Sequence, residues 1–390
     1  MKNALPNAAS SGGQVKITAI NALQPQSGAT LIRVETDAGV NGYGPCHGTG
    51  PFARAAIAGL EGPRLPHLGL IGKDPLAIDV HFYNMFYAYP QRGRVMGVLS
   101  AIDIALWDLA GKLLGQPVCR LLGGPFRDEI ALYSHCTGGD FLSRDEWRSR
   151  AQSLKDDPCG YKAYKIDIHH ILHGHVQQYV PSIGPREARD VAQAYGLARE
   201  AIGDEIDIIV HCHNELDLPS AIRVAEAVEP IKPLYFEDPI APEFGESWMA
   251  LRRTTRVPIL TGENIALAEG ALPFLQHQAV DSLQPDLINC GGITGAKRIA
   301  DLASLYRIPI SCHNVSGYVL DMASLQLSAA VFNCPLLECR RTAADAPEAT
   351  GEKLVIRDGR MKVPMRPGLG LELDFEYLEA HRADGEPWWD

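Results

Sequence analysis

Several features are missing from this sequence of 390 residues, and each absence excludes a class of protein. No run of about 18 apolar residues occurs, so we expect no membrane-spanning helix. The first 14 residues are polar and contain no apolar core, so we do not expect them to form a secretory signal. Positive charge is not in excess either, and the net charge of −11 argues against nucleic acid or an anionic membrane as a partner.

The nine cysteines form no CxxC pairs, and their number is odd. Most lie in apolar, strand-like stretches, for example Cys290, Cys312 and Cys334. We therefore interpret them as reduced, partly buried thiols of a cytoplasmic protein.

The chain has the pattern of a two-part α/β protein. Its length exceeds that of an ordinary single core and suits a barrel of about 250 residues with a smaller domain. Two strand-like runs, residues 15–23 and 30–39, and a helix-rich stretch ending at 123–124 predict an α+β capping domain over residues 15–128. The predicted barrel covers residues 129–345. We expect residues 346–390, including the hairpin-like stretch 353–363, to return to the cap.

Eight strand-like stretches occur from residue 129 onward: 131–136, 162–168, 206–212, 233–238, 257–262, 282–287, 308–313 and 334–339. Helix-like stretches such as 185–203, 220–230 and 295–306 separate them. Strands that alternate with helices of this length indicate parallel βαβ units. Eight such units predict a closed (β/α)₈ barrel, so the fold class is α/β.

Three of these strands carry a polar residue at their end at a fixed interval. His211, Glu237 and Glu263 are 26 residues apart, which is the length of one β/α unit. Barrels keep their chemistry at this end of the strands. Further polar residues at the strand ends are Lys165, Asp167, His213, Asp286, His313 and Glu338. A single residue of this kind can simply pair with a helix, but the joint pattern favours a functional site.

These residue types suit proton abstraction next to a carboxylate. His211, Glu237 and Glu263 can hold a divalent cation, and Mg²⁺ is expected because it prefers oxygen ligands. The metal would hold a substrate carboxylate and stabilise the charge that develops on it. Asp286 would orient His313 as a base.

Lys165 and His213 complete this site. Lys165 can bind the substrate carboxylate or act as a base with a lowered pKa. His213 follows His211 by two residues, so on a strand both side chains would face the same cavity, where His213 can serve as a general acid.

The long connection 169–185 contains His169, His170, His173 and His175. It can cover the substrate. Histidines in one loop can also bind metal, but without support from a strand we interpret this segment as a solvated loop.

Several segments together resemble the mandelate racemase subgroup of the enolase superfamily. They are residues 101–124, FEDP at 236–239, TGEN at 261–264, and PDLINCGGIT at 285–294 followed by His313. The resemblance covers about residues 15–378. It implies a metal-dependent enzyme that removes the α-proton of a carboxylate substrate, with a cap over the barrel mouth.

The resemblance also implies roles for single residues. Glu237 and Glu263 match the second and third metal ligands, and His313 with Asp286 matches the basic dyad. Glu338 matches an acid that hydrogen-bonds the substrate carboxylate. Lys165 matches the first lysine of a Lys-x-Lys motif.

Two positions depart from the pattern of the subgroup. Asp167 replaces the second lysine, so the usual base on the opposite face is missing and a two-base racemase is not expected. His211 replaces an aspartate ligand, which softens the site and lets Mn²⁺ or another divalent metal compete with Mg²⁺. His211 can also be no ligand at all. His213 matches a histidine with which acid-sugar dehydratases of the subgroup protonate the departing β-hydroxyl.

We therefore predict an acid-sugar dehydratase that converts an aldonate or aldarate to a 2-keto-3-deoxy acid. The alternatives are an epimerase, racemase or cycloisomerase that uses the same enolate, and a catalytically silent barrel. The expected partners are the sugar acid and further copies of the chain in a homo-oligomer. Substrate recognition is expected from the loops 25–28 and 46–54, and from Arg92 and Arg94.

Overall fold

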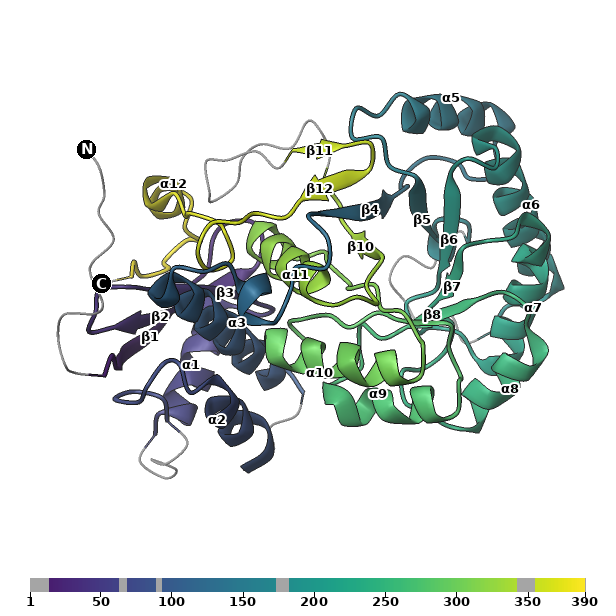
Figure 1. Ribbon diagram of the computed structural model, residues 1–390. Helices are drawn as coiled ribbons and strands as arrows, with labels where there is room; N and C mark the ends of the chain where they lie inside the picture. Colours follow the sequence, from purple (N-terminus) through teal and green to yellow (C-terminus); the bar gives the residue numbers. More distant parts are fainter. Residues whose placement is uncertain (1–13, 63–68, 89–92, 173–181, 342–354, 390) are drawn as a thin grey trace.

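The computed structural model describes residues 14–62, 69–88, 93–172, 182–341 and 355–389. Its N-terminal part contains an antiparallel sheet in the order β1-β2-β3, formed by β1 (Ile17–Leu23), β2 (Thr30–Thr36) and β3 (Gly42–Cys46). Next come α1 (Gly50–Leu60), α2 (Ile78–Tyr83), the π-helical turn η1 (Asn84–Ala88), α3 (Val95–Leu114) and α4 (Val118–Leu121). This part lies at one end of the molecule (Figure 1).

The long helix α3 packs directly on β3, and glycines make the close approach possible. A Cβ atom on Gly44 would lie 2.0 Å from the backbone oxygen of Ala101 in α3. The helix ends at Gly115, whose φ of 65° places it in the left-handed region that glycine adopts at low cost. The predicted α+β character of this part is confirmed.

The second part is a parallel α/β arrangement. Its strands β4 (Glu129–His135), β5 (Ala163–Asp167), β6 (Asp207–His211), β7 (Tyr235–Glu237), β8 (Ile259–Thr261) and β9 (Ser282–Leu283) pair in sequence order. On the other side of β4, β10 (Leu336–Glu338) pairs in parallel. The helices are α5 (Arg144–Lys155), α6 (Pro185–Ile202), α7 (Leu218–Val228), α8 (Glu246–Thr254), α9 (Leu267–Gln276), α10 (Gly292–Leu305) and α11 (Tyr318–Ala330). Short 3₁₀ turns η2 (Ile168–His170) and η3 (Glu229–Ile231) follow β5 and α7.

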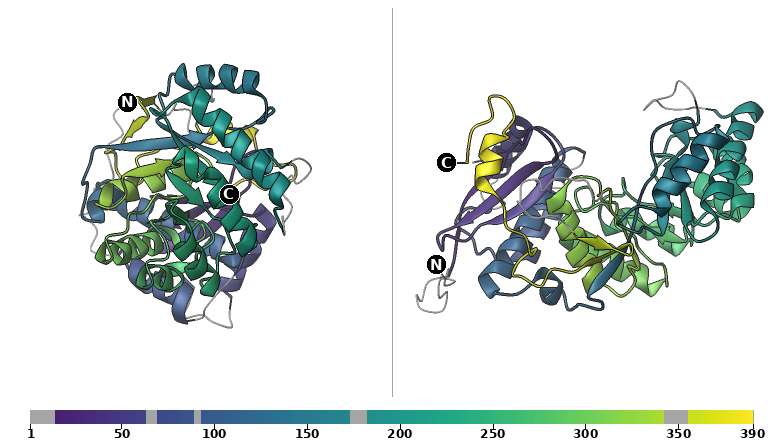
Figure 2. Two further views of the ribbon diagram at one scale, coloured as in Figure 1. Left: turned by 90° about the vertical axis from the view of Figure 1, so that its right-hand side faces the viewer. Right: turned by 90° about the horizontal axis from the view of Figure 1, so that it is seen from above.

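Helices α5 to α8 cover the outer side of β4 to β8, at the end of the molecule away from β1–β3 (Figures 1 and 2). The helices predicted at 185–203, 220–230 and 295–306 are confirmed as α6, α7 and α10.

One of the eight expected strands, residues 308–313, forms only isolated bridges. Ile310 pairs with Leu283 and His313 with Asp286. Pro285 has no N–H to donate, so the ladder between these two bridges cannot be continuous. On the other side, Ile310 N donates to Asn333 O at 2.8 Å. The parallel α/β sheet is therefore confirmed, whereas its closure into a complete (β/α)₈ barrel stays a prediction.

The C-terminal segment differs in part from the expectation. The hairpin β11 (Ile356–Arg357) and β12 (Arg360–Lys362) does not join the cap, because β12 pairs antiparallel with the first half of β4. Only Ser134 and His135 of β4 pair with β5, so the hairpin covers an edge that would otherwise be open.

The residues after this hairpin do lie against the cap. Helix α12 (Phe375–Ala380) lies beside β1–β3 in Figure 2. Pro25 forms a bridge with Arg382, and the Trp389 ring lies 5.8 Å from that of Tyr43. Residues 342–354 lie outside the described part of the chain, and the domain boundaries at 128 and 345 stay predictions.

Two further expectations concern the whole chain. All nine cysteines are buried and lie outside disulfide bonds, and their interpretation as reduced thiols stays a prediction. Among the described helices, none combines the length and the apolar character that crossing a membrane requires.

Candidate active site

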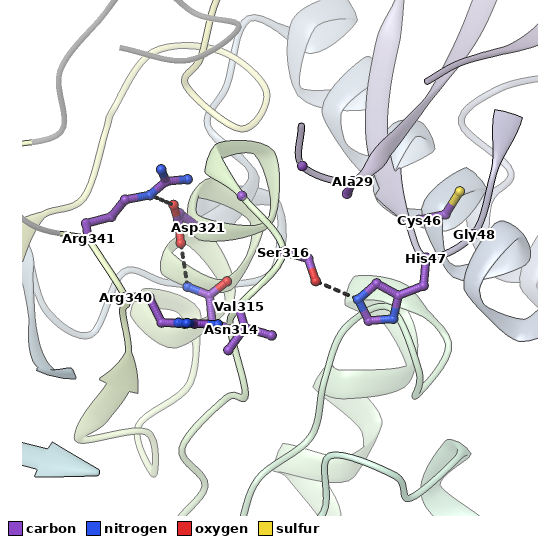
Figure 3. Close-up of a pocket in the computed structure, with 12 residues that line it drawn as sticks. Ala29, Cys46, His47, Gly48, Asn314, Val315, Ser316, Asp321, Arg340 and Arg341 are labelled. Carbon is purple, nitrogen blue, oxygen red and sulfur yellow. Dashed lines mark hydrogen bonds and ion pairs between the residues drawn. The ribbon is translucent and has the colours of Figure 1, made fainter. Parts of the chain in front are cut away.

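A cavity of about 370 Å³ separates the cap from the segments that follow the strands of the second part (Figure 3). The cap contributes Gly28 and His47 to its lining, and the other side contributes Asn314, Ser316 and Arg340. His47 Nε2 and Ser316 Oγ, 2.5 Å apart, connect the two sides. The loops expected to recognise substrate therefore border this cavity.

Of the two arginines expected there, only Arg94 lies within the described residues. Arg94 is exposed and is not among the residues that line the cavity, and Arg92 lies outside the described residues. Arg54 points instead to Glu386 near the C-terminus, with an N–O distance of 2.5 Å.

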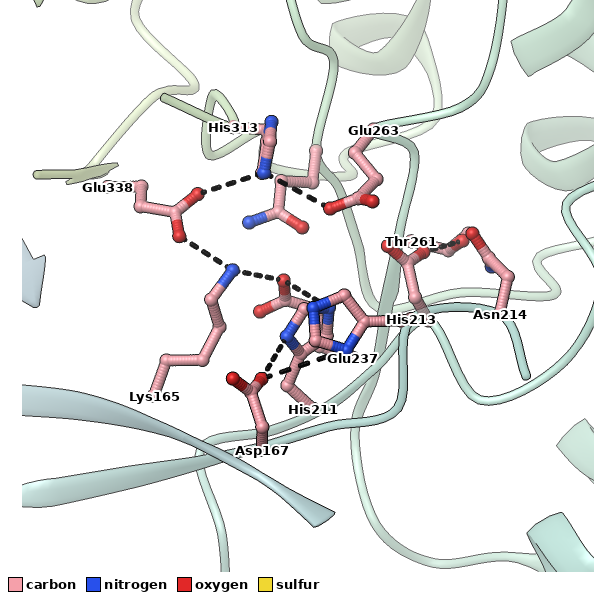
Figure 4. A network of polar contacts seen from close by, with 12 residues as sticks. Lys165, Asp167, His211, His213, Asn214, Glu237, Thr261, Glu263, His313 and Glu338 are labelled. Atoms are coloured by element: carbon pink, nitrogen blue, oxygen red, sulfur yellow. Dashed lines mark hydrogen bonds and ion pairs between the residues drawn. The ribbon is translucent and has the colours of Figure 1, made fainter. Parts of the chain in front are cut away.

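Beside this cavity, the strand register brings the predicted polar residues together (Figure 4). Asp167 on β5 pairs with His211 on β6, and His211 pairs with Glu237 on β7. Asn314 links the cavity to the cluster because its backbone N–H donates to Glu338 Oε2 at 3.1 Å. Parallel strands in register thus place all of these side chains at one edge of the sheet.

Four side chains can hold a metal ion. Ligand atoms of His211, Glu237, Asp238 and Glu263 all lie within 4.8 Å of one another. Three buried atoms in this group, His211 Nε2, Glu237 Oε2 and Asp238 Oδ2, have no hydrogen-bond partner among the described residues. Buried polar atoms rarely stay unpaired, so the donor set fits a divalent cation.

The electrostatics of these carboxyl groups support the same conclusion. Burial raises the pKa of Glu237 to about 8 and that of Asp238 to about 7. Glu263 behaves differently: burial opposes its ionisation, but the charges of His313, His211 and Lys165 outweigh burial and lower its pKa. A bound dication would favour the ionised form of all three carboxyl groups.

Lys165 lies at the centre of the cluster and forms two buried ion pairs. Its Nζ is 2.7 Å from Glu237 Oε1 and 2.6 Å from Glu338 Oε1. Burial alone would lower the pKa of Lys165, but the charges of these glutamates and of Glu263 outweigh burial and raise it. Of the two roles expected for Lys165, the ion pairs favour the cation that binds a carboxylate, and its role as a base stays a prediction.

His313 and Asp286 form the expected dyad. His313 Nδ1 donates to Asp286 Oδ2 at 2.7 Å, which leaves Nε2 facing Glu263 Oε2 at 3.1 Å and Glu338 Oε2 at 3.8 Å. Burial opposes protonation of this imidazole, yet the charges of Glu263, Glu338 and Asp286 raise its pKa to about 10. A dication bound by the carboxyl groups would offset the charge of Glu263 and lower this pKa, and Nε2 would then be the atom that can accept a proton from a substrate carbon.

His213 lies in the cluster as predicted, but the backbone conformation that places it there differs from the expected strand. Strand β6 ends at His211, and His213 has a φ of 51°, so strand alternation does not set its direction. Its ring still lies 3.7 Å from that of His211. Its side chain is 38% exposed, and burial lowers its pKa. Among the described imidazoles of the cluster, His213 is therefore the most exposed to solvent.

Two contributors to this cluster escaped the sequence analysis. His135 ends β4, and its Nε2 donates to Glu338 Oε1 at 2.5 Å. The rule applied to the other strands, a polar residue at the strand end, would have found it. Asp238 directly follows Glu237, but its φ of 46° turns it toward Thr261, whose hydroxyl donates to Oδ1. No sequence pattern signals such a turn.

Two of the four histidines in the loop 169–185, His169 and His170, lie within the described residues. His169 Nε2 and His170 Nε2 lie 4.0 and 3.7 Å from Asp167 Oδ2. Asp167, His169 and His213 form a second group with ligand atoms within 4.8 Å of one another, so His169 lies against the site, while the role of the rest of the loop stays a prediction. His173 and His175 lie outside the described residues.

An α/β fold with a cap, a group of side chains that can bind a metal ion, and a His–Asp dyad are together typical of one class of enzyme. Comparison with known protein families identifies the same class. Residues 14–123 match the N-terminal domain family of mandelate racemase and muconate lactonizing enzyme, and residues 146–378 match the enolase C-terminal domain-like family. The chain belongs to the enolase superfamily, in its mandelate racemase and muconate lactonizing enzyme branch.

Among its relatives, D-xylonate dehydratase of Haloferax volcanii is 35% identical over 92% of this chain and 87% of that protein. D-gluconate dehydratase of Thermoproteus tenax is 30% identical over 91% of this chain and 70% of that protein. A mandelate racemase/muconate lactonizing enzyme-like protein from Rubrobacter xylanophilus has a similar structure. Its TM-score is 0.83 at 33% identity, over 96% of this chain and 99% of that one.

Proposed function

We propose that this protein is a metal-dependent dehydratase of sugar acids, a hydro-lyase that produces 2-keto-3-deoxy acids. One observation carries the proposal: a buried set of metal-suited side chains lies against a His–Asp dyad, with a second imidazole, His213, open to solvent. The relatives named for D-xylonate and D-gluconate support an aldonate as the substrate.

The residues act on the substrate carboxylate first. Lys165, held between Glu237 and Glu338, supplies a fixed ammonium group for one carboxylate oxygen. His211, Glu237 and Glu263, with Asp238 beside them, would hold a divalent cation, which when bound stabilises negative charge on that carboxylate. Mg²⁺ is the expectation from the sequence, with Mn²⁺ or another dication as the alternative. The role of Glu338 as a direct partner of the substrate stays a prediction.

Proton transfer follows from the two imidazoles. His313 Nε2 takes the α-proton, and Asp286 stabilises the imidazolium that forms. The electron pair of the broken C–H bond forms the Cα–Cβ double bond and expels the β-hydroxyl, which His213 protonates to water. The resulting enol tautomerises to the 2-keto-3-deoxy acid.

The closure of the parallel sheet into a barrel is also part of the proposal. The bonds from residues 308–313 to β9 and to residues 333–338 support a sheet that closes into a (β/α)₈ barrel. A homo-oligomeric assembly and a cytoplasmic location are further predictions of the same interpretation.

A screen of aldonic, aldaric and uronic acids tests the proposed function. Purified protein with Mg²⁺, and separately with Mn²⁺, should release a 2-keto acid that semicarbazide traps. The variant His313→Asn should release none while it still binds metal. If no acid gives product with either metal, the result favours the silent barrel.

A further inference from the structure

Two neighbouring side chains of the site, Asp167 and His211, form a pair with a very short contact. His211 Nδ1 lies 2.5 Å from Asp167 Oδ1 across the register of β5 and β6 (Figure 4). Both residues are buried. A carboxylate can only accept a hydrogen bond, so Nδ1 carries the proton and Nε2 keeps its lone pair.

The free nitrogen of His211 points into the group of carboxylates. Nε2 lies 3.5 Å from Glu237 Oε1 and within 4.8 Å of oxygens of Asp238 and Glu263. It is buried and accepts no hydrogen bond from any described residue. A cation between this lone pair and the carboxylate oxygens would give all of these buried atoms a partner.

The same pair could instead act as a second His–Asp base, but access argues against that role. The His211 side chain is 2% exposed, and the His213 ring lies 3.7 Å from it. A base needs direct reach of a substrate carbon, whereas a metal ligand needs only the cation. The His213 side chain is 38% exposed, so it is the more accessible of these two imidazoles.

We propose that Asp167 is a positioning residue that fixes His211 as a neutral nitrogen ligand, so that the centre takes a transition-metal dication such as Mn²⁺ or Co²⁺ in preference to Mg²⁺. An imidazole nitrogen suits these ions better than it suits Mg²⁺, which prefers oxygen. A carboxylate that holds the second ring nitrogen is the usual support of a histidine ligand. The inference rests on the proposed function only for the presence of a divalent cation.

Metal binding tests this directly on the full chain, without any substrate. Titration of the metal-free protein with Mn²⁺, followed by electron paramagnetic resonance, gives the affinity, and competition with Mg²⁺ gives the preference. Wild type should bind Mn²⁺ at least tenfold more tightly than Mg²⁺. Pulsed measurements of the bound Mn²⁺ should show coupling to a directly coordinated ¹⁴N.

The variants separate positioning from ligation. Asp167→Asn should weaken Mn²⁺ binding by about tenfold to a hundredfold, because the ring loses its anchor. The double variant Asp167→Asn with His211→Asp should lose the ¹⁴N coupling and shift the preference toward Mg²⁺. Asp145→Asn on α5, where the side chain is 90% exposed, is the matched control and should change neither quantity. Circular dichroism confirms that each variant is folded.

Three results would overturn the inference: Mg²⁺ preferred by wild type, unchanged Mn²⁺ affinity in Asp167→Asn, or ¹⁴N coupling that survives in the double variant. The readout does not depend on turnover. A protein that binds Mn²⁺ through His211 but dehydrates no acid refutes the proposed function alone, and a dehydratase whose metal ignores His211 refutes this inference alone.

Discussion

Single residues set the chemistry, and the two imidazoles differ in their surroundings. His313 is buried and held by Asp286, whereas His213 is exposed and lies beside His211. The buried one suits removal of a carbon-bound proton, and the exposed one suits protonation of a leaving hydroxyl. Because their surroundings differ, substituting each histidine in turn tests whether the two imidazoles act in different steps.

His213→Asn should uncouple the two half-reactions. We expect water elimination to fall by about 10² to 10⁴, the usual contribution of a general acid, while exchange of the α-proton with solvent continues. Deuterium incorporation by NMR measures the exchange, and the yield of keto acid measures the elimination. His313→Asn should lose both activities. Loss of exchange in His213→Asn as well would contradict the assigned roles.

The sequence predicted most of this cluster because its members share a simple rule, a polar residue at the end of a parallel strand. The rule placed Lys165, Glu237 and His313 correctly. It could not give the partner of each residue, since the contact between Asp167 and His211 depends on strand register. It also failed for Asp238, which enters the cluster through a left-handed backbone turn.

At the scale of elements, the contact between α3 and β3 is the tightest place in the cap. Gly44→Ala would place a methyl group 2.0 Å from the Ala101 backbone oxygen, and backbone cannot move aside easily. We expect this variant to lower the free energy of unfolding by about 3 kcal/mol.

Gly59→Ala in α1 is the control, because its Cβ would meet nothing within 4 Å. That change should be neutral or stabilise by about 0.5 kcal/mol. Denaturant unfolding measures both, and equal effects would contradict this packing.

Helix α3 also contacts α10, through a buried carboxyl group. Thr294 N–H donates to Asp103 Oδ2 at 2.9 Å, and burial raises the pKa of Asp103 to about 7 despite the nearby Arg298. The folded state therefore binds this proton more tightly than the unfolded state. The stability that the proton contributes is complete below about pH 4 and is lost as the pH rises through about 7.

Asp103→Asn should remove this dependence on pH. Between pH 4 and pH 8, wild type should lose stability relative to the variant, by about 1.4 kcal/mol for each unit of pKa shift at most. Thermal unfolding at a series of pH values measures the difference. A difference between the two proteins that does not change with pH would show that Asp103 is ionised throughout.

Element boundaries show where sequence patterns reach their limit. The helices α6, α7 and α10 follow their apolar periodicity, so they were predictable. Residues 308–313 have the composition of a strand, yet Pro285 on the neighbouring segment interrupts the ladder. The hairpin 356–362 was recognisable as a hairpin, but the sequence carries no signal for the open edge of β4 that it covers.

At the scale of the whole molecule, the C-terminal tail fastens the cap. Glu386 is buried, and its carboxylate accepts hydrogen bonds from Arg54 at 2.5 Å and from the backbone N–H of Gln24 at 3.0 Å. The tail therefore joins two segments of the cap, the residue that follows β1 and helix α1.

Glu386→Gln should loosen this attachment and lower the free energy of unfolding by about 1–2 kcal/mol, because Arg54 is partly exposed and recovers some hydration. Glu379→Gln, an exposed position on α12, is the matched control and should be neutral. Limited proteolysis should release the tail faster in the first variant only. Equal release from both variants would contradict this role of the tail.

The overall arrangement explains why the proposed chemistry needs both parts of the chain. The cap closes one side of the cavity, and the strand ends carry the reactive groups (Figures 3 and 4). The division of the chain into a cap and an α/β part could be predicted from composition and from the alternation of strand-like and helix-like stretches. Their mutual placement could not, because it depends on side-chain contacts such as that between His47 and Ser316.

Proton NMR of the purified protein with sugar acids in D₂O, in the presence of Mn²⁺ and separately of Mg²⁺, tests the dehydratase proposal most directly. D-xylonate and D-gluconate, for which the two relatives are named, are the first acids to try. We expect signals of the new C3 methylene group of a 2-keto-3-deoxy acid, with one deuterium at C3. Loss of the α-proton signal without these signals would contradict dehydration and favour an epimerase or cycloisomerase.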